Sequence, residues 1–231
     1  NIISIAPHTL VLAFSNLTME NITAIKSFLL PGKTYCLLGS SGVGKTTLLN
    51  IIGSLDVPSS GEVTVLDRSI NNLNAREAAR LRKEKLGFIF QSYNLFVVHT
   101  VYENVEFPLL LLNFSSQERG KMVMDALEWV GLTDKIKSKP PQLSGGECQR
   151  VAIARAMVKH PSLVLADEPT GNLDPETSGE ILTLLKKINK RGTAVLVVTH
   201  NYDLVKKANE RVIKLDDGRA LKAIIKQKAE S

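Results

Sequence analysis

Gly39-Ser40-Ser41-Gly42-Val43-Gly44-Lys45-Thr46 is the stretch that decides the fold of this 231-residue chain. It matches the pattern G-x-x-x-x-G-K-[ST] and stands between a strand expected at residues 33–39 and a helix expected at residues 44–52. Glycines let such a loop curl so that its backbone N–H groups point at phosphates, and Lys45 adds a positive charge. This context predicts a phosphate-binding loop rather than a Gly/Ser-rich turn with an unrelated lysine.

An acidic pair follows a second apolar strand pattern. Residues 162–166 read Ser-Leu-Val-Leu-Ala, which is typical of a strand buried on both faces of a parallel sheet, and Asp167-Glu168 come next. Such a dipeptide is usually a solvated turn, but the strand before it and Pro169-Thr170 after it disfavour that interpretation. We expect Asp167 to hold Mg²⁺ through water and Glu168 to polarise an attacking water as a general base. The Thr46 hydroxyl is a further expected Mg²⁺ ligand.

Two more strand patterns end in polar residues. Residues 86–90 end before Gln91, and residues 193–199 end before His200. Because an open parallel sheet binds its ligand at the carboxyl ends of its strands, these side chains are expected near the acidic pair. The Gln91 amide oxygen could then reach the metal, and His200 could contact the γ-phosphate. Taken alone, a glutamine there means little, and a lone histidine is more often structural.

A second anion site is expected at Leu143-Ser144-Gly145-Gly146-Glu147, which opens a helical apolar pattern that continues from Val151. Free backbone N–H groups at a helix N-terminus, with a serine hydroxyl beside them, favour an anion. One nucleotide needs one phosphate cradle. This second site must therefore have another task.

Strand patterns alternate with helical ones along most of the chain, which indicates an α/β fold with a parallel sheet. Residues 94–139 interrupt this alternation and are mainly helical. We predict one domain over residues 1–231, with a core at 1–93 and 160–231 and an inserted helical subdomain at about 94–159. Further expected elements are a strand at 61–66 and helices at 74–85, 115–130 and 175–190. Asp174 is a candidate N-cap for the last of these helices.

Composition is ordinary for a globular protein, with 44% hydrophobic and 23% charged residues. The longest apolar run, residues 107–112, contains a proline and is too short to cross a bilayer. The net charge of +6 comes from scattered lysines and arginines, and aromatic residues make up only 5%, so a nucleic-acid partner is not expected. A solvated surface or a face near an anionic membrane remains open. Cys36 and Cys148 lie far apart, which suggests reduced thiols in a cytosolic setting.

In their order along the chain, these motifs resemble those of the ATP-binding-cassette (ABC) ATPases. The matching segments are the Walker A loop at 39–46, the Q-loop at Gln91, the LSGGE signature at 143–147, Walker B at 163–168, the D-loop at 171–174 and the H-loop at His200. The resemblance implies a phosphate-loop NTPase core of mostly parallel sheet, an antiparallel β subdomain and an inserted α-helical subdomain. The segments LGFIFQSYNL, TVYENVEFPLLL and ADEPTGNLD are similar to those of lipoprotein-release, macrolide-export and antimicrobial-peptide-resistance ATPases, and of a cell-division ATPase.

The resemblance also implies the roles of the site residues. ATP and Mg²⁺ are the expected cofactors, with Glu168, His200 and Lys45 as catalytic residues and Thr46, Gln91 and Asp167 at the metal, Asp167 through water. The residues expected to bind ATP are Gly39, Ser40, Ser41, Gly42, Val43, Gly44, Lys45, Thr46, Thr47, Gln91 and Asp167 of one copy, with Ser144, Gly145, Gly146 and Glu147 of another.

The resemblance implies a homodimer that closes on ATP and powers a transmembrane permease subunit or a fused membrane domain, for export or mechanotransmission. The chain would lie peripherally at the cytoplasmic face of the membrane. The alternative is an ABC-type ATPase without transport, which signals to a cell-wall enzyme or associates with DNA.

The chain departs from the family pattern in two places. Members usually carry an aromatic residue before Walker A that stacks on adenine, where this chain aligns Asn21, and Phe14 is the nearest aromatic candidate. The signature continues Glu-Cys-Gln-Arg, whereas Gln-Gln-Gln-Arg or Glu-Gln-Gln-Arg is common. Cys148 lies past the residues that would face phosphate, so little effect is expected.

Overall fold

The computed structural model describes residues 2–5, 34–38, 45–59, 61–208, 210–216 and 219–223. The loop at 39–44 lies outside the described residues, as do Phe14, Asn21 and the side chain of Lys45. Among the helices of the described segments, none is long and apolar enough to span a membrane.

The main sheet has six strands, and the carboxyl ends of its five parallel strands form one edge. Its order is β5 (Leu86–Phe90), β6 (Leu163–Asp167), β7 (Ala194–Thr199), β2 (Thr34–Leu38), β8 (Arg211–Asp216) and β9 (Arg219–Ala223). All neighbours pair in parallel except β8 and β9. In this register Phe90 lies beside Asp167, Asp167 beside Val198 and Leu38 beside Thr199. The polar residues that follow these strands therefore start from the same edge.

A smaller sheet contains β1 (Ile2–Ile5), β3 (Glu62–Val65) and β4 (Arg68–Ser69). Its β3–β4 pair is antiparallel, whereas β1 pairs with β3 in parallel. The predicted fold class is confirmed, as are the strands and helices proposed from periodicity. Sequence patterns did not identify β1, β4, β8, β9 or the short helix α8 (Tyr202–Ala208).

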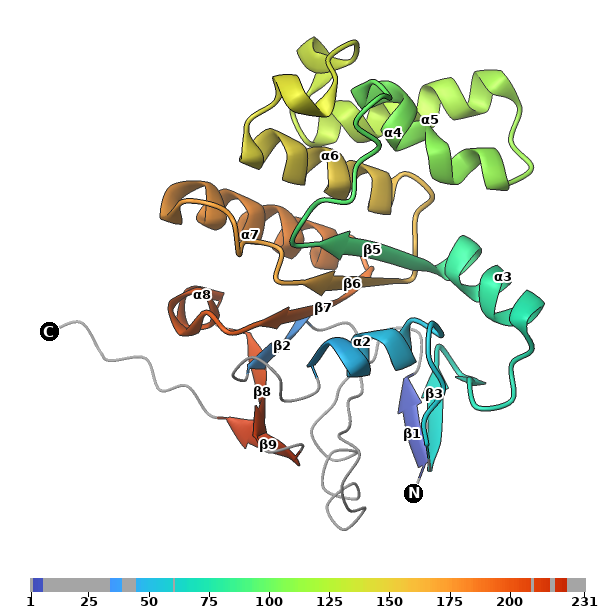
Figure 1. Ribbon diagram of the computed structural model, residues 1–231, viewed down its shortest axis with the longest axis vertical. Helices are drawn as coiled ribbons and strands as arrows, with labels where there is room; N and C mark the ends of the chain where they lie inside the picture. The colour runs from blue at the N-terminus through green and yellow to red at the C-terminus, as the bar shows by residue number, and fades with distance from the viewer. Residues whose placement is uncertain are drawn as a thin grey trace, which may run out of the picture.

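Helices cover both faces of the main sheet (Figure 1). α2 (Lys45–Ile52) lies on one face and α7 (Pro175–Lys190) on the other, while α3 (Ala75–Lys85) precedes β5 at one side. The predicted cap of α7 is confirmed, because the Asp174 carboxylate accepts hydrogen bonds from the backbone N–H groups of Glu176 and Thr177, both at 3.0 Å. These bonds hold the pKa of Asp174 below its usual range.

A helical layer lies beyond α7, above β5 in Figure 1. It consists of α4 (Val101–Glu106), α5 (Ser116–Trp129), α6 (Gly145–Met157) and the short 3-10 turns η1 (Phe107–Leu111), η2 (Thr133–Lys135) and η3 (Pro140–Gln142). Helix α6 is central to this layer, since Val151, Ala152, Ile153 and Ala154 are all fully buried.

The strand pleat divides the core into two clusters. Val195 and Val197 of β7 pack with the helical layer, whereas Leu196 and Val198 pack with α2 and the small sheet. Successive side chains of a strand point to opposite faces, so one strand serves both clusters. The all-apolar strand patterns in the sequence reflect this two-sided burial.

The loop that leaves β5 is tied to α6 by one buried cation. The Arg155 guanidinium donates to the carbonyl of Asn94 and, at 2.7 Å, to that of Tyr93. Both acceptors have left-handed backbone conformations, with φ of 48° and 61°. Burial lowers the pKa of Arg155 to about 10, so it remains charged at neutral pH. These bonds fix the chain path between the sheet and the helical layer.

Replacing this cation should weaken the fold. Arg155→Met keeps most of the apolar contact and removes both charged hydrogen bonds, so we expect the free energy of unfolding to fall by about 2 kcal/mol. Urea denaturation measures this loss of free energy, and the m-value should be unchanged. Arg150→Met is the matched control, because Arg150 forms only a partly exposed 3.2 Å pair with Glu180, and its loss should cost less than about 1 kcal/mol. Equal losses in the two variants would contradict the role of Arg155.

Candidate nucleotide site

Oxygen ligands from two distant segments meet at the edge of the sheet. Thr46, in the first turn of α2, has its hydroxyl oxygen 3.4 Å from Asp167 Oδ2 at the end of β6. A hydroxyl and a carboxylate are hard oxygen donors of the kind that Mg²⁺ prefers. The donor set therefore fits the predicted metal, and the two residues converge although 121 positions separate them.

Glu168 is held at this edge by its backbone and by its carboxylate. Its N–H donates to the Val198 carbonyl at 2.8 Å, which extends the β6–β7 ladder by one residue. Its φ of 46° is left-handed, an uncommon conformation for a residue with a side chain and one that occurs at functional sites. Oε1 lies 2.7 Å from His200 Nδ1, and Oε2 accepts a 3.0 Å hydrogen bond from the Thr199 hydroxyl.

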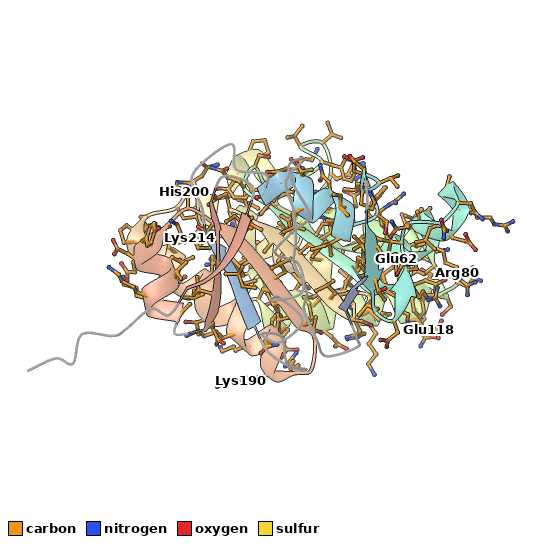
Figure 2. The ribbon with its side chains drawn as sticks, turned by 90° about the horizontal axis from the view of Figure 1, so that it is seen from below. Glu62, Arg80, Glu118, Lys190, His200 and Lys214 are labelled. Carbon is orange, nitrogen blue, oxygen red and sulfur yellow. The ribbon has the colours of Figure 1, made fainter. Side chains whose placement is uncertain are left out.

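His200 combines this contact with exposure. Its side chain is 62% exposed, whereas that of Glu168 is only 13% exposed. Figure 2 labels His200, which follows β7, and Lys190, the last residue of α7, on opposite sides of the view. The histidine can thus hold the carboxylate and still reach a ligand that approaches from solvent.

Gln91 reaches the segment after Glu168. Its amide N–H donates to Asn172 Oδ1, and the Asn172 amide donates back to the Gln91 carbonyl, both at 3.2 Å. A Cβ added to Gly171 would lie 2.6 Å from Gln91 Nε2, so a larger residue there would displace the Gln91 amide. The structure thus joins the Q-loop to the D-loop, and the metal contact of Gln91 stays a prediction.

The signature forms the N-terminus of α6. Ser144 is the N-cap, and its hydroxyl accepts a 3.2 Å hydrogen bond from the Glu147 N–H while the Glu147 carboxylate accepts one of 2.7 Å from the Ser144 N–H. Lys135 adds an ion pair to Glu147 at 3.3 Å. The bond from the Ser144 N–H is the main reason that the pKa of Glu147 lies below its usual range, and Lys135 lowers it further while burial opposes the shift.

Close packing around the signature glycines explains why they lack side chains. A Cβ on Gly146 would meet Thr177 of α7 at 2.6 Å, and one on Gly145 would meet the Tyr93 hydroxyl at 2.9 Å. Ser144 and both glycines of the predicted trans site thus lie at one helix start. In the described part of the protein, Gly145 faces Tyr93 and Leu173 of the D-loop, and Gly146 faces Thr177 of α7.

Sequence reasoning missed three residues of this constellation. Thr199 was treated only as a strand end, yet its hydroxyl holds the Glu168 carboxylate. Tyr93 carries no motif-level signal, and its position two residues after Gln91 was the available clue. Asn172 was identified only as part of the D-loop, without its contact to Gln91.

A groove of about 460 Å³ lies away from this constellation. It is bounded by α3, β5, η1 and the end of α6, and several apolar side chains on it are unusually exposed, including Leu111 at 56% and Leu55 at 55%. Its cationic lining residues are Arg82, Lys83, Arg155 and Lys159. Burial lowers the pKa of Lys159 to about 8, and its ammonium donates to the Arg82 carbonyl at 2.8 Å.

Comparison with known proteins connects this geometry to a family. The family model described as "ABC transporter" matches residues 23–171 of the chain. The chain belongs to the ABC transporter family. It is 44% identical over 199 residues to the macrolide export ATP-binding/permease protein MacB of Campylobacter jejuni, covering 86% of this chain and 31% of that one. It is 44% identical over 191 residues to the cell division ATP-binding protein FtsE of Mycobacterium tuberculosis, covering 83% of each.

A solved structure extends the likeness to three dimensions. An ATP-binding cassette solved as a dimer in a post-hydrolysis state with ADP and phosphate superposes with a TM-score of 0.74 at 38% identity, covering 92% of this chain and 96% of that one. The chain is therefore an ABC ATPase domain, from a family that hydrolyses ATP and supplies ATP-binding subunits to transporters. The chain spans about a third of the length of MacB.

The cap of this ABC domain's signature helix should make stability depend on pH. The pKa of Glu147 is lower in the folded protein than in the unfolded chain, so its ionised form stabilises the fold above the unfolded pKa of about 4.3. This contribution is lost as the pH falls through the lower, folded-state pKa. Urea denaturation should show wild type more stable than Glu147→Gln at pH 7, with the difference shrinking toward pH 3. A difference that stays constant across this range would contradict the account.

Proposed function

We propose that this ABC domain works as a homodimer in which two copies enclose ATP between them and transmit closure to a membrane partner. The observation that carries the proposal is the fixed carboxylate of Glu168, which shares one edge of the sheet with Thr46, Asp167 and His200. The ATP dimer geometry is supported by the likeness to a cassette solved as a dimer with ADP and phosphate.

Each copy would contribute opposite halves of a site. The loop at 39–46 of one copy binds the phosphates, and the N-terminus of α6 in the other copy approaches the γ-phosphate. That helix end carries free N–H groups and the positive end of the helix dipole, so the anion favours closure. ADP and phosphate bind the closed form less well once the γ-phosphate is cleaved, and the dimer reopens.

Hydrolysis would rely on the residues at the sheet edge. Glu168 accepts a proton from the attacking water. Its backbone hydrogen bond to Val198 fixes the position of the main chain from which that carboxylate extends. Lys45 and His200 neutralise charge that develops on the γ-phosphate. Mg²⁺, held by Thr46 directly, by Asp167 through water and with the help of Gln91, would lower the charge on the phosphate oxygens.

Changing the base tests this mechanism. Glu168→Gln keeps the size of the side chain and removes its ability to take a proton, so kcat should fall by about 100-fold or more while ATP still drives dimer formation. Phosphate release measures the first effect, and light scattering after size exclusion measures the second. Glu128→Gln makes the same change on the exposed face of α5 and should leave both unchanged. Full turnover by Glu168→Gln would remove the proposed base.

We propose that the groove between the helical layer and the core receives a segment of a transmembrane permease, either a separate subunit or a fused membrane domain. Supporting this, the groove exposes large apolar side chains, which monomeric surfaces seldom gather, and its wall contains Arg155, which holds the Gln91 loop. A partner seated there would hold the domain at the cytoplasmic face of the membrane. The motion of the helical insert at about 94–159 would then reach it.

Two neighbouring leucines allow the groove to be tested against the surface beside it. Leu111 lines the groove and is 56% exposed, whereas Leu110 is 54% exposed but is not a lining residue. We expect Leu111→Asp to reduce co-purification with a separately encoded membrane partner by about 10-fold, with ATPase activity of the isolated domain unchanged. Leu110→Asp should retain the partner. Equal retention by both variants would rule out this groove as the docking site.

Signalling to a cell-wall enzyme is a second candidate, and the 44% identity to FtsE favours it over other non-transport functions. Both candidates share the ATPase cycle and differ in what the partner does. Substrate movement into vesicles that contain the assembled complex supports transport. ATP-dependent activation of a cell-wall hydrolase without such movement supports signalling.

A further inference from the structure

Gln149 is a buried amide whose hydrogen bond leaves its own helix. It lies in the second turn of α6 with no exposed surface, and its Nε2–H donates to the Pro169 carbonyl at 2.7 Å. Its Oε1 is buried too and has no hydrogen-bond partner among the described residues. A methionine of similar length would fill this space without an unsatisfied oxygen. Packing alone therefore does not account for the amide.

The acceptor of this bond directly follows the proposed general base. Pro169 has no backbone N–H, so its carbonyl is the one backbone polar group through which that residue can be held. The neighbouring backbone bonds belong to Glu168, whose N–H donates to Val198 and whose carbonyl accepts a 3.0 Å bond from Gly171. Glu168 also has a left-handed backbone, with φ of 46°, a conformation that persists only when its surroundings impose it.

The helix side of the contact is fixed independently of Gln149. The N-terminus of α6 has its capping box and the pair between Glu147 and Lys135, and farther along Arg155 holds the loop after β5. Gly146 packs on α7 as well. Loss of the Gln149 bond would therefore be felt mainly by the loop that carries Glu168. The signature would keep most of its restraints.

We propose that Gln149 is a positioning residue that holds the Glu168 backbone against the signature helix. The proposal rests on the role of Glu168 as general base. It also means that the start of α6, which would contact ATP held by a second copy, is bonded through Gln149 to the residue that follows the base acting on ATP held by its own copy. One side chain thus joins the two half-sites of each subunit.

The test compares the effect of one substitution on kcat with its effect on KM and on ATP-driven dimer formation. Gln149→Met removes the donor and keeps the volume, so kcat for ATP hydrolysis should fall about 10-fold or more, because small displacements of a catalytic group cost large factors in rate. KM for ATP should change less than about twofold. In the Glu168→Gln background, the added Gln149→Met change should leave ATP-driven dimer formation within about twofold, which also shows that the variant folds.

A second buried substitution on the same helix controls for general loosening. Ile153 is fully buried in the core between the helical layer and the sheet, and Ile153→Val destabilises without touching Pro169. Its kcat should match wild type. Equal kcat losses in Gln149→Met and Ile153→Val would overturn the proposal, as would loss of ATP-driven dimers with the Gln149 change. Full turnover by Glu168→Gln alone would instead refute the base assignment, so the two failures are distinguishable.

Discussion

The in-register parallel pairing of β5, β6 and β7 determines where the reactive side chains of this domain lie. Parallel strands that end together place the residues that follow them at one edge, so Gln91, Asp167 and His200 start from neighbouring positions although they are far apart in sequence. The Glu168 N–H bond to Val198 continues that ladder beyond the last strand residue. A slip of one residue would turn these side chains to other faces and separate them.

A second level of organisation comes from α6, which is bonded to the loops that follow β5 and β6. Its N-terminus carries the signature, its middle binds Pro169 through Gln149, and its later turns hold the loop after β5 through Arg155. Buried polar side chains that bond to backbone carbonyls are specific in direction, because a carbonyl accepts only along its own plane. The helix thereby acts as a rigid frame that links segments 93–94, 144–147 and 168–169. Events at one of these segments have a physical route to the others.

Much of this fold could be predicted because its signals are local. Glycine spacing around Lys45, the apolar strand before Asp167 and the cap at Asp174 each follow from a few adjacent residues. The missed parts depend on distant contacts. Nothing in the letters around Thr199 shows that its hydroxyl will meet Glu168, and Gln149 resembles any polar helix residue until its burial is known. Strand β9 lies at the sheet edge with β8 beside it, and both carry charged residues, so their patterns are weak.

The cap of α6 determines whether the start of this helix stays folded while the domain opens and closes. A hydroxyl group has two lone pairs and one proton: the Ser144 oxygen accepts from the Glu147 N–H, and its proton faces the Glu147 carboxylate. Turning this proton from the carboxylate to an arriving phosphate oxygen would leave both backbone hydrogen bonds of the cap in place. The helix can therefore engage and release an anion without fraying at its first turn. Helix α6 would then keep its secondary structure through repeated turnover, and the conformational change would be taken up by the loops that flank it.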